Sequence, residues 1–202
     1  MPPPLTHVFF DIGGVLGTNG WDSEQRADAA KLYDLGPEFE PRHREIVGDW
    51  ELGRISADEY LDIAVFYEPR AFSREDFLVC MRDQSRPYPE SIALARRLAD
   101  GDGVRLFTLN NESAELNQYR IEKFGLQGIF DAFLSSCWLG VRKPTQRIYT
   151  AALAIAQAPP ERSLFIDDRP QNLAPAAARG MRTLLYEGPA QLEAALAVSG
   201  LL

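Results

Sequence analysis

Short apolar runs alternate with amphipathic stretches along most of the chain. Runs typical of strands that are buried on both faces occupy residues 6–10, 104–109, 132–134, 163–166 and 182–186. Apolar side chains at helical spacing predict helices over residues 90–100, 113–124, 145–157, 170–179 and 189–198. Strands that alternate with helices are typical of βαβ units, so we expect an α/β fold with a parallel sheet and helices on both of its faces.

A long helical segment interrupts this alternation after the first strand. Between residues 18 and 86 we find no convincing strand, and the apolar spacing predicts helices over residues 22–33, 42–52, 57–66 and 74–84. Two of these begin with the serine-to-acid spacing of a capping box, at Ser56/Glu59 and Ser73/Asp76. The sequence therefore predicts a core made of residues 1–17 and 87–202 and an inserted all-helical cap made of residues 18–86.

Polar side chains follow three of the predicted strands at the point where each strand ends. Asp11 follows the first strand, Asn110 and Asn111 follow the second, and Asp167 and Asp168 follow the fourth. Ligands of open α/β sheets bind outside the carboxyl ends of the strands. If these strands are parallel neighbours, the carboxylates and amides converge on one edge of the sheet.

Three carboxylates in one small site need a positive counter-charge, because like charges at close range raise one another's pKa values. A hard divalent cation meets this need, and Mg²⁺ in particular is held by one or two carboxylates together with substrate phosphate. Lys143, in a loop before a predicted helix, can bring a second positive charge to the same place. Gly13 and Gly14, just after Asp11, allow the backbone to turn sharply and to approach a ligand closely.

The acidic composition narrows the choice of partners. Acidic residues number 29 and basic residues 21, which gives a net charge of −8. Nucleic acids and anionic membranes attract basic surfaces, so we expect neither as a partner, whereas a small anionic substrate can still bind a locally positive pocket. The N-terminal segment has neither a basic region nor a long apolar core, so we expect no signal peptide and a cytoplasmic protein. The sequence does not indicate an oligomeric state.

Four short motifs, in this order, resemble those of the haloacid dehalogenase superfamily of hydrolases. The motifs are FFDIGGVLG (residues 9–17), FTLNNES (107–113), RKP (142–144) and FIDDRPQN (165–172). The resemblance covers nearly the whole chain and implies a Rossmann-like core with a helical cap after the first strand. WELGRIS, residues 50–56, also resembles a cap segment of the subgroup related to glucose-1-phosphate phosphatases.

The resemblance implies a Mg²⁺-dependent phosphatase that acts on a small phosphorylated metabolite. Asp11 would attack phosphorus and form an aspartyl-phosphate, while Lys143 would stabilise the charge of the transferring group. Asn110 stands where the family usually has serine or threonine. The resemblance therefore implies three catalytic residues, which are Asp11, Lys143 and Asn110. The residues at substrate-binding positions are Asn110, Asn111 and Lys143. Those at metal-binding positions are Asp11, Gly13, Asp167 and Asp168.

Gly13 departs from the family pattern. The phosphatases of the family usually carry a second aspartate there, which acts as general acid and then as general base, and such catalysis typically contributes roughly 10²–10⁴-fold. Three explanations stay open. The substrate has a good leaving group; another group, such as Glu112, Glu51 or a substrate hydroxyl, moves the proton; or the chain has given up hydrolysis.

Two alternative functions follow from this departure. The 2-haloacid dehalogenases of the superfamily also lack the second aspartate, because halide leaves without a proton, but they use no metal. A non-catalytic module that binds phosphate and Mg²⁺ would likewise tolerate Gly13. The Asp167-Asp168 pair favours the phosphatase over the dehalogenase, since it would otherwise have no cation to hold.

The tryptophans are expected to pack, and the two histidines do not indicate a metal site. Trp21, Trp50 and Trp138 are interpreted as packing residues, although one in the cap is a weaker candidate for lining the substrate pocket. His7 and His43 are too isolated in the sequence to suggest a pair of ligands.

Overall fold

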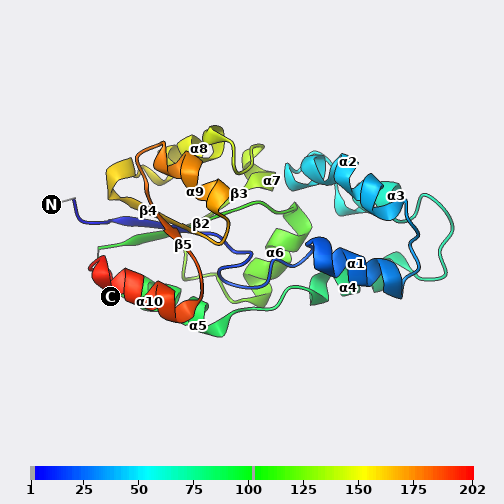
Figure 1. Cartoon of the computed structure of the whole chain (residues 1–202), viewed down its shortest axis with the longest axis horizontal. Helices are drawn as coiled ribbons and strands as arrows, with labels where there is room; N and C mark the ends of the chain where they lie inside the picture. The colour runs from blue at the N-terminus through cyan, green and yellow to red at the C-terminus, as the bar shows by residue number, and fades with distance from the viewer. Residues whose placement is uncertain (1–2, 102) are drawn as a thin grey trace.

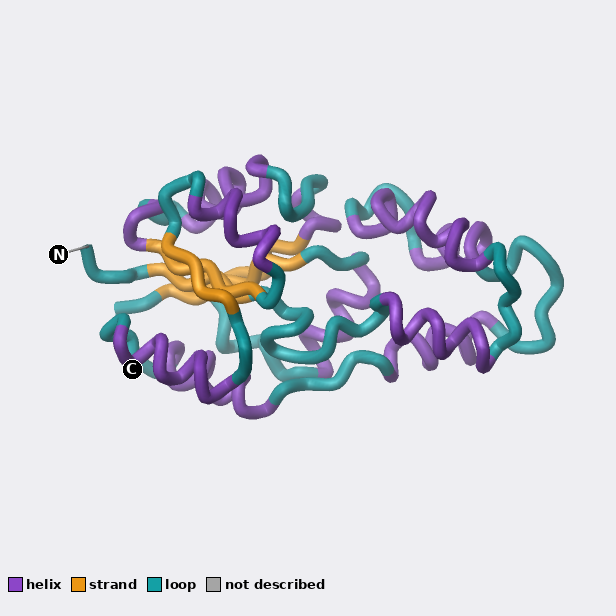
Figure 2. The backbone as a smooth tube through the Cα atoms, viewed as in Figure 1, coloured by secondary structure: helices purple, strands orange, loops and turns teal. Residues whose placement is uncertain are grey.

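A five-stranded parallel sheet forms the centre of the protein. The computed structural model describes residues 3–101 and 103–202, so residues 1–2 and 102 of the predicted core lie outside the described part. The strands are β1 (His7–Phe10), β2 (Arg105–Asn110), β3 (Ala132–Ser135), β4 (Ser163–Asp167) and β5 (Arg182–Leu185). Their order across the sheet is β3-β2-β1-β4-β5, and all neighbours are parallel. The predicted parallel α/β fold is therefore confirmed (Figures 1 and 2).

Helices cover both faces of the sheet. They are α5 (Pro89–Ala99), α6 (Ala114–Lys123), the short α7 (Ser136–Leu139), α8 (Gln146–Ala156), α9 (Pro170–Ala177) and α10 (Pro189–Val198), with a 3-10 turn at Pro160–Arg162. Side chains of β1 alternate between the faces, as strand geometry requires. Val8 and Phe10 join a buried cluster with residues of α5 and α10, whereas Phe9 joins one with residues of α8 and α9. None of the described helices has the length and apolar character needed to cross a membrane.

Strand register brings the polar ends together. Phe10 of β1 pairs with Thr108 of β2 on one side and with Ile166 of β4 on the other. The Asp11 amide then donates a hydrogen bond to the Ile166 carbonyl at 2.9 Å. As a result, the residues that follow β1 and β4 emerge side by side at the carboxyl edge of the sheet.

Four helices between β1 and α5 gather away from the sheet, and we call them the cap helices. They are α1 (Ser23–Leu32), α2 (Phe39–Glu51), α3 (Ala57–Ala64) and α4 (Arg74–Asp83). Figure 1 shows them on the right, beyond the carboxyl edge of the sheet. They share a buried apolar cluster of their own, to which Leu116 of α6 also contributes. The division into a core and a cap with the boundaries given above stays a prediction.

Local signals placed most helix starts correctly. The capping boxes at Ser56/Glu59 and Ser73/Asp76 are confirmed, each with reciprocal hydrogen bonds. Helix α2, however, begins at Phe39 rather than at the predicted residue 42. Pro41 lies in its first turn, where a missing N–H and a fixed φ are tolerated, so this proline does not mark the boundary.

Candidate active site

Three carboxylates meet at the carboxyl edge of β1 and β4. Asp11 follows β1, Asp167 is the last residue of β4, and Asp168 comes next. One oxygen of each lies within 4.8 Å of an oxygen of the other two, which is a spacing suited to a metal ion. Burial raises the pKa of Asp11 and of Asp168, and the neighbouring Asp167 carboxylate adds to both effects. This cluster therefore needs compensating positive charge.

Lys143 supplies part of that charge. Its side chain is buried, and its Nζ lies 2.9 Å from Asp11 Oδ2 and 2.6 Å from Asp167 Oδ2. Burial disfavours the ammonium form, but the two carboxylates outweigh it and raise the pKa of Lys143. The structure thus places the Lys143 ammonium beside Asp11, the residue at the position that the motifs predict for the nucleophile. One lysine beside three acids leaves the cluster with excess negative charge.

Asp167 and Asp168 differ in their partners. Besides Lys143, Asp167 accepts hydrogen bonds from the Asn172 side-chain amide at 2.9 and 3.0 Å and from the Arg169 backbone amide at 2.8 Å. Asp168 has one long hydrogen bond, from Asn19 Nδ2 to Oδ2 at 3.4 Å. Its Oδ1 is buried and has no hydrogen-bond partner among the described residues. A buried carboxylate oxygen without a partner is costly, and a bound cation would satisfy it.

The two glycines after Asp11 have different backbone conformations and different neighbours. Gly14 has φ of 76°, and a Cβ on it would lie 2.2 Å from Asp168 Oδ2. Only glycine therefore lets this loop pass so close to the Asp168 carboxylate. Gly13 lies outside the positive-φ region, and a Cβ there would meet Asn19 Oδ1 at 2.9 Å and Arg120 Nη1 at 3.6 Å.

The two asparagines at the end of β2, Asn110 in its last position and Asn111 after it, have different surroundings. Asn110 is buried; its amide donates to Asn117 Oδ1 at 2.9 Å, and its carbonyl oxygen accepts from Ser135 Oγ at 2.8 Å. Asn111 lines the cavity described below and holds the Lys143 backbone through two hydrogen bonds of 2.9 Å. Asn111 therefore positions Lys143. Asn110 has one amide hydrogen engaged inside the core, and its role toward phosphate stays a prediction.

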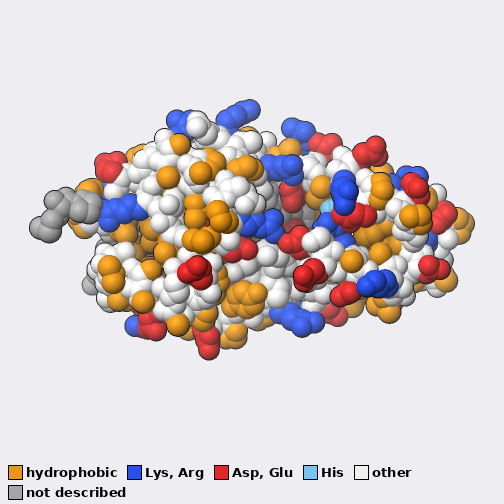
Figure 3. All heavy atoms as spheres, in the orientation of Figure 1, with side chains coloured by type: hydrophobic (Ala, Val, Ile, Leu, Met, Phe, Trp, Pro, Cys, Tyr) orange, Lys and Arg blue, Asp and Glu red, His pale blue; other side chains and the backbone are white. Residues whose placement is uncertain are grey.

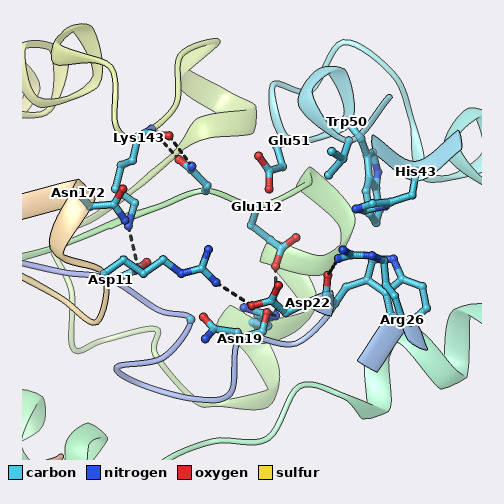
Figure 4. Close-up of a pocket in the computed structure, with 16 residues that line it drawn as sticks. Asp11, Asn19, Asp22, Arg26, His43, Trp50, Glu51, Glu112, Lys143 and Asn172 are labelled. Carbon is cyan, nitrogen blue, oxygen red and sulfur yellow. Dashed lines mark hydrogen bonds and ion pairs between the residues drawn. The ribbon is translucent and has the colours of Figure 1, made fainter. Parts of the chain in front are cut away.

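A cavity of about 250 Å³ lies between these strand ends and the cap helices. Figure 4 shows Asp11, Lys143 and Asn172 on one side of it and Arg26, His43 and Trp50 on the opposite side. In Figure 3 the surface is hollowed at this junction, with acidic and basic side chains around the hollow. The lining residues are Asp11, Gly13, Asn19, Trp21, Asp22, Arg26, His43, Val47, Trp50, Glu51, Asn111, Glu112, Arg120, Lys143, Arg169 and Asn172.

Both carboxylates considered as substitutes for the missing acid line this cavity. Glu112 is buried, and its Oε2 lies 3.2 Å from Nη2 of the equally buried Arg120. Burial raises the pKa of Glu112, although Arg120 opposes this. Glu51, from α2, lies 2.7 Å from Arg142 Nη1. Glu112 comes from the loop after β2 and is therefore the one attached to the same sheet edge as Asp11.

Several residues of the site were not predicted from the sequence. Asn172 follows Asp167 by five positions and lies in the first turn of α9, so the helix start at Pro170 would have placed it near the acids. Asn19 and Arg120 carry no comparable signal. Arg120 reaches the site from α6, where it donates to Ser85 Oγ at 3.1 Å and to the Asn19 carbonyl at 2.9 Å.

A nucleophile-position aspartate, a buried lysine and paired acids at the end of a parallel sheet define a hydrolase of the haloacid dehalogenase type. A family model for haloacid dehalogenase-like hydrolases matches residues 5–180, and the chain therefore belongs to that family. The predicted family and hydrolase class are thereby confirmed, whereas the cap subgroup stays a prediction.

Two curated relatives have names that bear on chemistry. Drimenol cyclase drtB from Aspergillus calidoustus is 26% identical over 183 residues, which make up 89% of this chain and 33% of the cyclase. This chain therefore spans about a third of that relative. Sesquiterpene phosphatase astK from Aspergillus oryzae is 28% identical over 180 residues, or 86% of each chain.

Solved structures agree on the fold. A haloacid dehalogenase family enzyme from Bacteroides thetaiotaomicron has a TM-score of 0.80 at 20% identity, over 92% of this chain and 95% of that chain. The same enzyme in complex with magnesium and inorganic phosphate has a TM-score of 0.76. Solved L-2-haloacid dehalogenases share the fold as well. At these identities the likeness shows the fold alone.

Proposed function

We propose that the protein is a Mg²⁺-dependent phosphatase that hydrolyses a small phosphate monoester through an aspartyl-phosphate on Asp11. The observation that carries this proposal is the buried Asp168 Oδ1, which has no partner in the described part of the chain and lies within the three-carboxylate cluster beside Lys143. The relative named as a sesquiterpene phosphatase and the related enzyme solved with magnesium and phosphate support the same chemistry.

The residues present fit a magnesium ion. Asp11, Asp168 and the Gly13 carbonyl would hold it, because carboxylate and carbonyl oxygens are its preferred protein ligands. Asp167 would not be a direct ligand but would orient Lys143 and Asn172, since its oxygens are already engaged by these two residues. When bound, Mg²⁺ would offset the charge of the acids and of the substrate phosphate, which lowers the barrier to anionic attack.

The chain's own residues then account for both half-reactions. An Asp11 oxygen forms a bond to phosphorus while the ester oxygen leaves with the bonding electrons and takes up a proton. Water next attacks phosphorus, gives up a proton, and releases phosphate and the free Asp11 carboxylate. Lys143 holds Asp11 as an anion and stabilises the transferring group. Glu112 is the candidate for giving and taking the proton.

The same geometry weighs against the alternatives. A dehalogenase needs no metal, so it would leave the Asp168 oxygen without a partner. A non-catalytic binding module would need neither the nucleophile position nor the close contact of Lys143 with Asp11. Gly13 is the one feature that favours either of them.

Metal removal separates these functions. We expect the protein to release phosphate from small phosphate monoesters in Mg²⁺, to stop in excess EDTA, and to resume when Mg²⁺ is restored. Phosphate is measured colorimetrically and halide by ion chromatography with a 2-haloacid as substrate. Halide release in EDTA would identify a dehalogenase instead, and release of neither ion would identify a binding module.

A matched pair of variants tests the metal site itself. We expect Asp168→Asn to weaken Mg²⁺ binding more than roughly tenfold, because Asn removes the negative oxygen that lacks a protein partner. Asp167→Asn should weaken it less, since Asp167 acts through Lys143 and Asn172. Asp22→Asn is the control, as Asp22 lines the cavity but is paired with Arg169 at 2.8 Å. Calorimetry that gives the wild-type affinity for both cluster variants would remove the metal site.

A further inference from the structure

The charges that the cap side presents to the cavity are already paired within the protein. Arg26 makes two hydrogen bonds of 3.0 Å to Glu40 and one of 2.9 Å to the Trp21 carbonyl. Asp22 is paired with Arg169, and Glu51 with Arg142. A second charge on the substrate, away from its phosphate, would therefore find no unpaired counter-charge among the described residues of this wall.

A chain of hydrogen bonds in the cap fixes the imidazole of His43. Trp21 Nε1 donates to Tyr60 Oη at 2.9 Å, and Tyr60 Oη lies 2.9 Å from His43 Nδ1. All three side chains are buried. The tyrosine oxygen accepts from the indole, and His43 Nδ1 is the acceptor that the described contacts offer to its own hydrogen. We therefore assign the proton of the neutral ring to Nε2.

The surroundings keep this ring neutral and hold it in place. Burial and the nearby Arg26 lower the pKa of His43 to about 4, although Glu40 opposes the shift. The Trp50 ring stacks on Tyr60 with centroids 4.0 Å apart and planes 15° from parallel. The donor chain thus sits on a rigid aromatic base, and such preorganisation favours directional recognition.

His43 Nε2 has no hydrogen-bond partner among the described residues, yet the side chain is 3% exposed and lines the cavity. Nε2 is not among the described side-chain atoms that are both fully buried and without a partner, so part of its surface is accessible. In Figure 4, His43 lies across the cavity from Asp11. A neutral N–H donor therefore lines the wall of the cavity opposite the nucleophile position.

We propose that His43 Nε2 donates a hydrogen bond to an oxygen of the leaving group, and that the substrate is a small phosphate ester of an uncharged, oxygen-bearing alcohol. This proposal rests on the phosphatase function proposed above. It disfavours leaving groups with a second phosphate or a carboxylate, because the cap charges are paired. It also disfavours long hydrocarbon groups, because a cavity of about 250 Å³ is below the roughly 300–1,000 Å³ that hold drug-sized ligands.

Three esters of similar size and one long one test the proposal by phosphate release. Glycerol phosphate carries uncharged hydroxyls, propyl phosphate lacks them, phosphoglycerate adds a carboxylate, and farnesyl phosphate is a long hydrocarbon. We expect kcat/KM of the wild type to favour glycerol phosphate over each of the others, and over propyl phosphate by roughly tenfold. His43→Phe should reduce this glycerol-to-propyl ratio to about one, because it keeps a ring but removes the donor.

A second pair of variants examines the hydrogen-bond chain. Tyr60→Phe removes the hydroxyl that fixes the tautomer, so the ratio should fall part of the way. Tyr33→Phe is the control, because its hydroxyl bonds the Asp76 carbonyl and the residue does not line the cavity. Nitrogen-15 NMR of the imidazoles should show the Nε2–H tautomer of His43 at neutral pH, and the chain has one other histidine to assign.

Failure of the inference differs from failure of the proposed function. Mg²⁺-dependent release that favours propyl or farnesyl phosphate, an unchanged ratio in His43→Phe, or an Nδ1–H tautomer would each overturn the inference and leave a phosphatase. No Mg²⁺-dependent release from any ester would overturn both together.

Discussion

Asp11→Asn is expected to abolish turnover, with a loss of phosphate release of at least about 10³-fold. Asparagine keeps the size and shape of the side chain but cannot form the acyl-phosphate bond. The variant should still fold, because asparagine has nearly the same shape, and burial and the neighbouring Asp167 carboxylate oppose a negative charge at this position although Lys143 favours it. Lys143 also keeps its contact with Asp167. Steady-state phosphate release and a thermal melt measure the two effects.

Beryllofluoride adds a readout that is independent of turnover. It mimics an aspartyl-phosphate, so it should bind the wild type in the presence of Mg²⁺ and should not bind Asp11→Asn. Asn111→Asp is a useful companion variant, since it disturbs the backbone of Lys143 without removing the nucleophile. Asp11→Asn with activity near that of the wild type, in a preparation free of contaminating phosphatase, would refute covalent catalysis on Asp11.

The sequence predicted the part of the site that depends on strand ends. Asp11 and Asp167 could be placed together because an apolar run followed by an acid marks a strand terminus, and parallel strands end at one edge. Asp168 came with them as the next residue. The order of the strands was not predicted, although β1 and β4 must be neighbours for these acids to meet.

Residues that reach the site from distant parts of the chain could not be predicted from the sequence. Arg120 lies on α6 and contacts Ser85, Asn19 and Glu112 only because the chain before α5 returns to the sheet beside it. His43 is isolated in the sequence, because its partner Tyr60 is on another helix and its place in the cavity depends on how the cap helices pack. Such contacts follow from how helices pack, which local periodicity does not encode.

Trp21 and Trp50 show the limit of a choice between packing and function. Both are buried and both line the cavity, so the packing interpretation is right as far as it goes. Their rings hold Tyr60 through a hydrogen bond and a stacking contact, and Tyr60 in turn contacts His43. Packing residues of this kind can set the geometry of a binding site without touching the reacting atoms.

Gly13→Asp is expected to increase the hydrolysis of alkyl phosphates, by roughly 10²-fold if the new carboxylate acts as the general acid. The wild type should favour p-nitrophenyl phosphate, whose phenolate leaves with little protonation, over propyl phosphate, whose alkoxide needs a proton. The substitution carries no left-handed backbone strain, because Gly13 lies outside the positive-φ region. Its Cβ would approach Asn19 Oδ1 at 2.9 Å, and that flexible amide can move aside.

Arg120 is expected to limit the increase in alkyl phosphate hydrolysis in Gly13→Asp. Its Nη1 would lie 3.6 Å from the new Cβ, so the guanidinium would favour the ionised aspartate and oppose its use as an acid. Gly13→Asn is the matched control, because it has the same shape without a transferable proton. Both variants should bind Mg²⁺ as the wild type does in calorimetry. If Gly13→Asp then gives no selective gain on propyl phosphate, the missing aspartate was not the limiting deficit.

Glu112→Gln identifies the reason in that case. A loss of activity on propyl phosphate that exceeds the loss on p-nitrophenyl phosphate would show that Glu112 supplies the proton. Equal losses on the two esters would show that Glu112 does not protonate the leaving group.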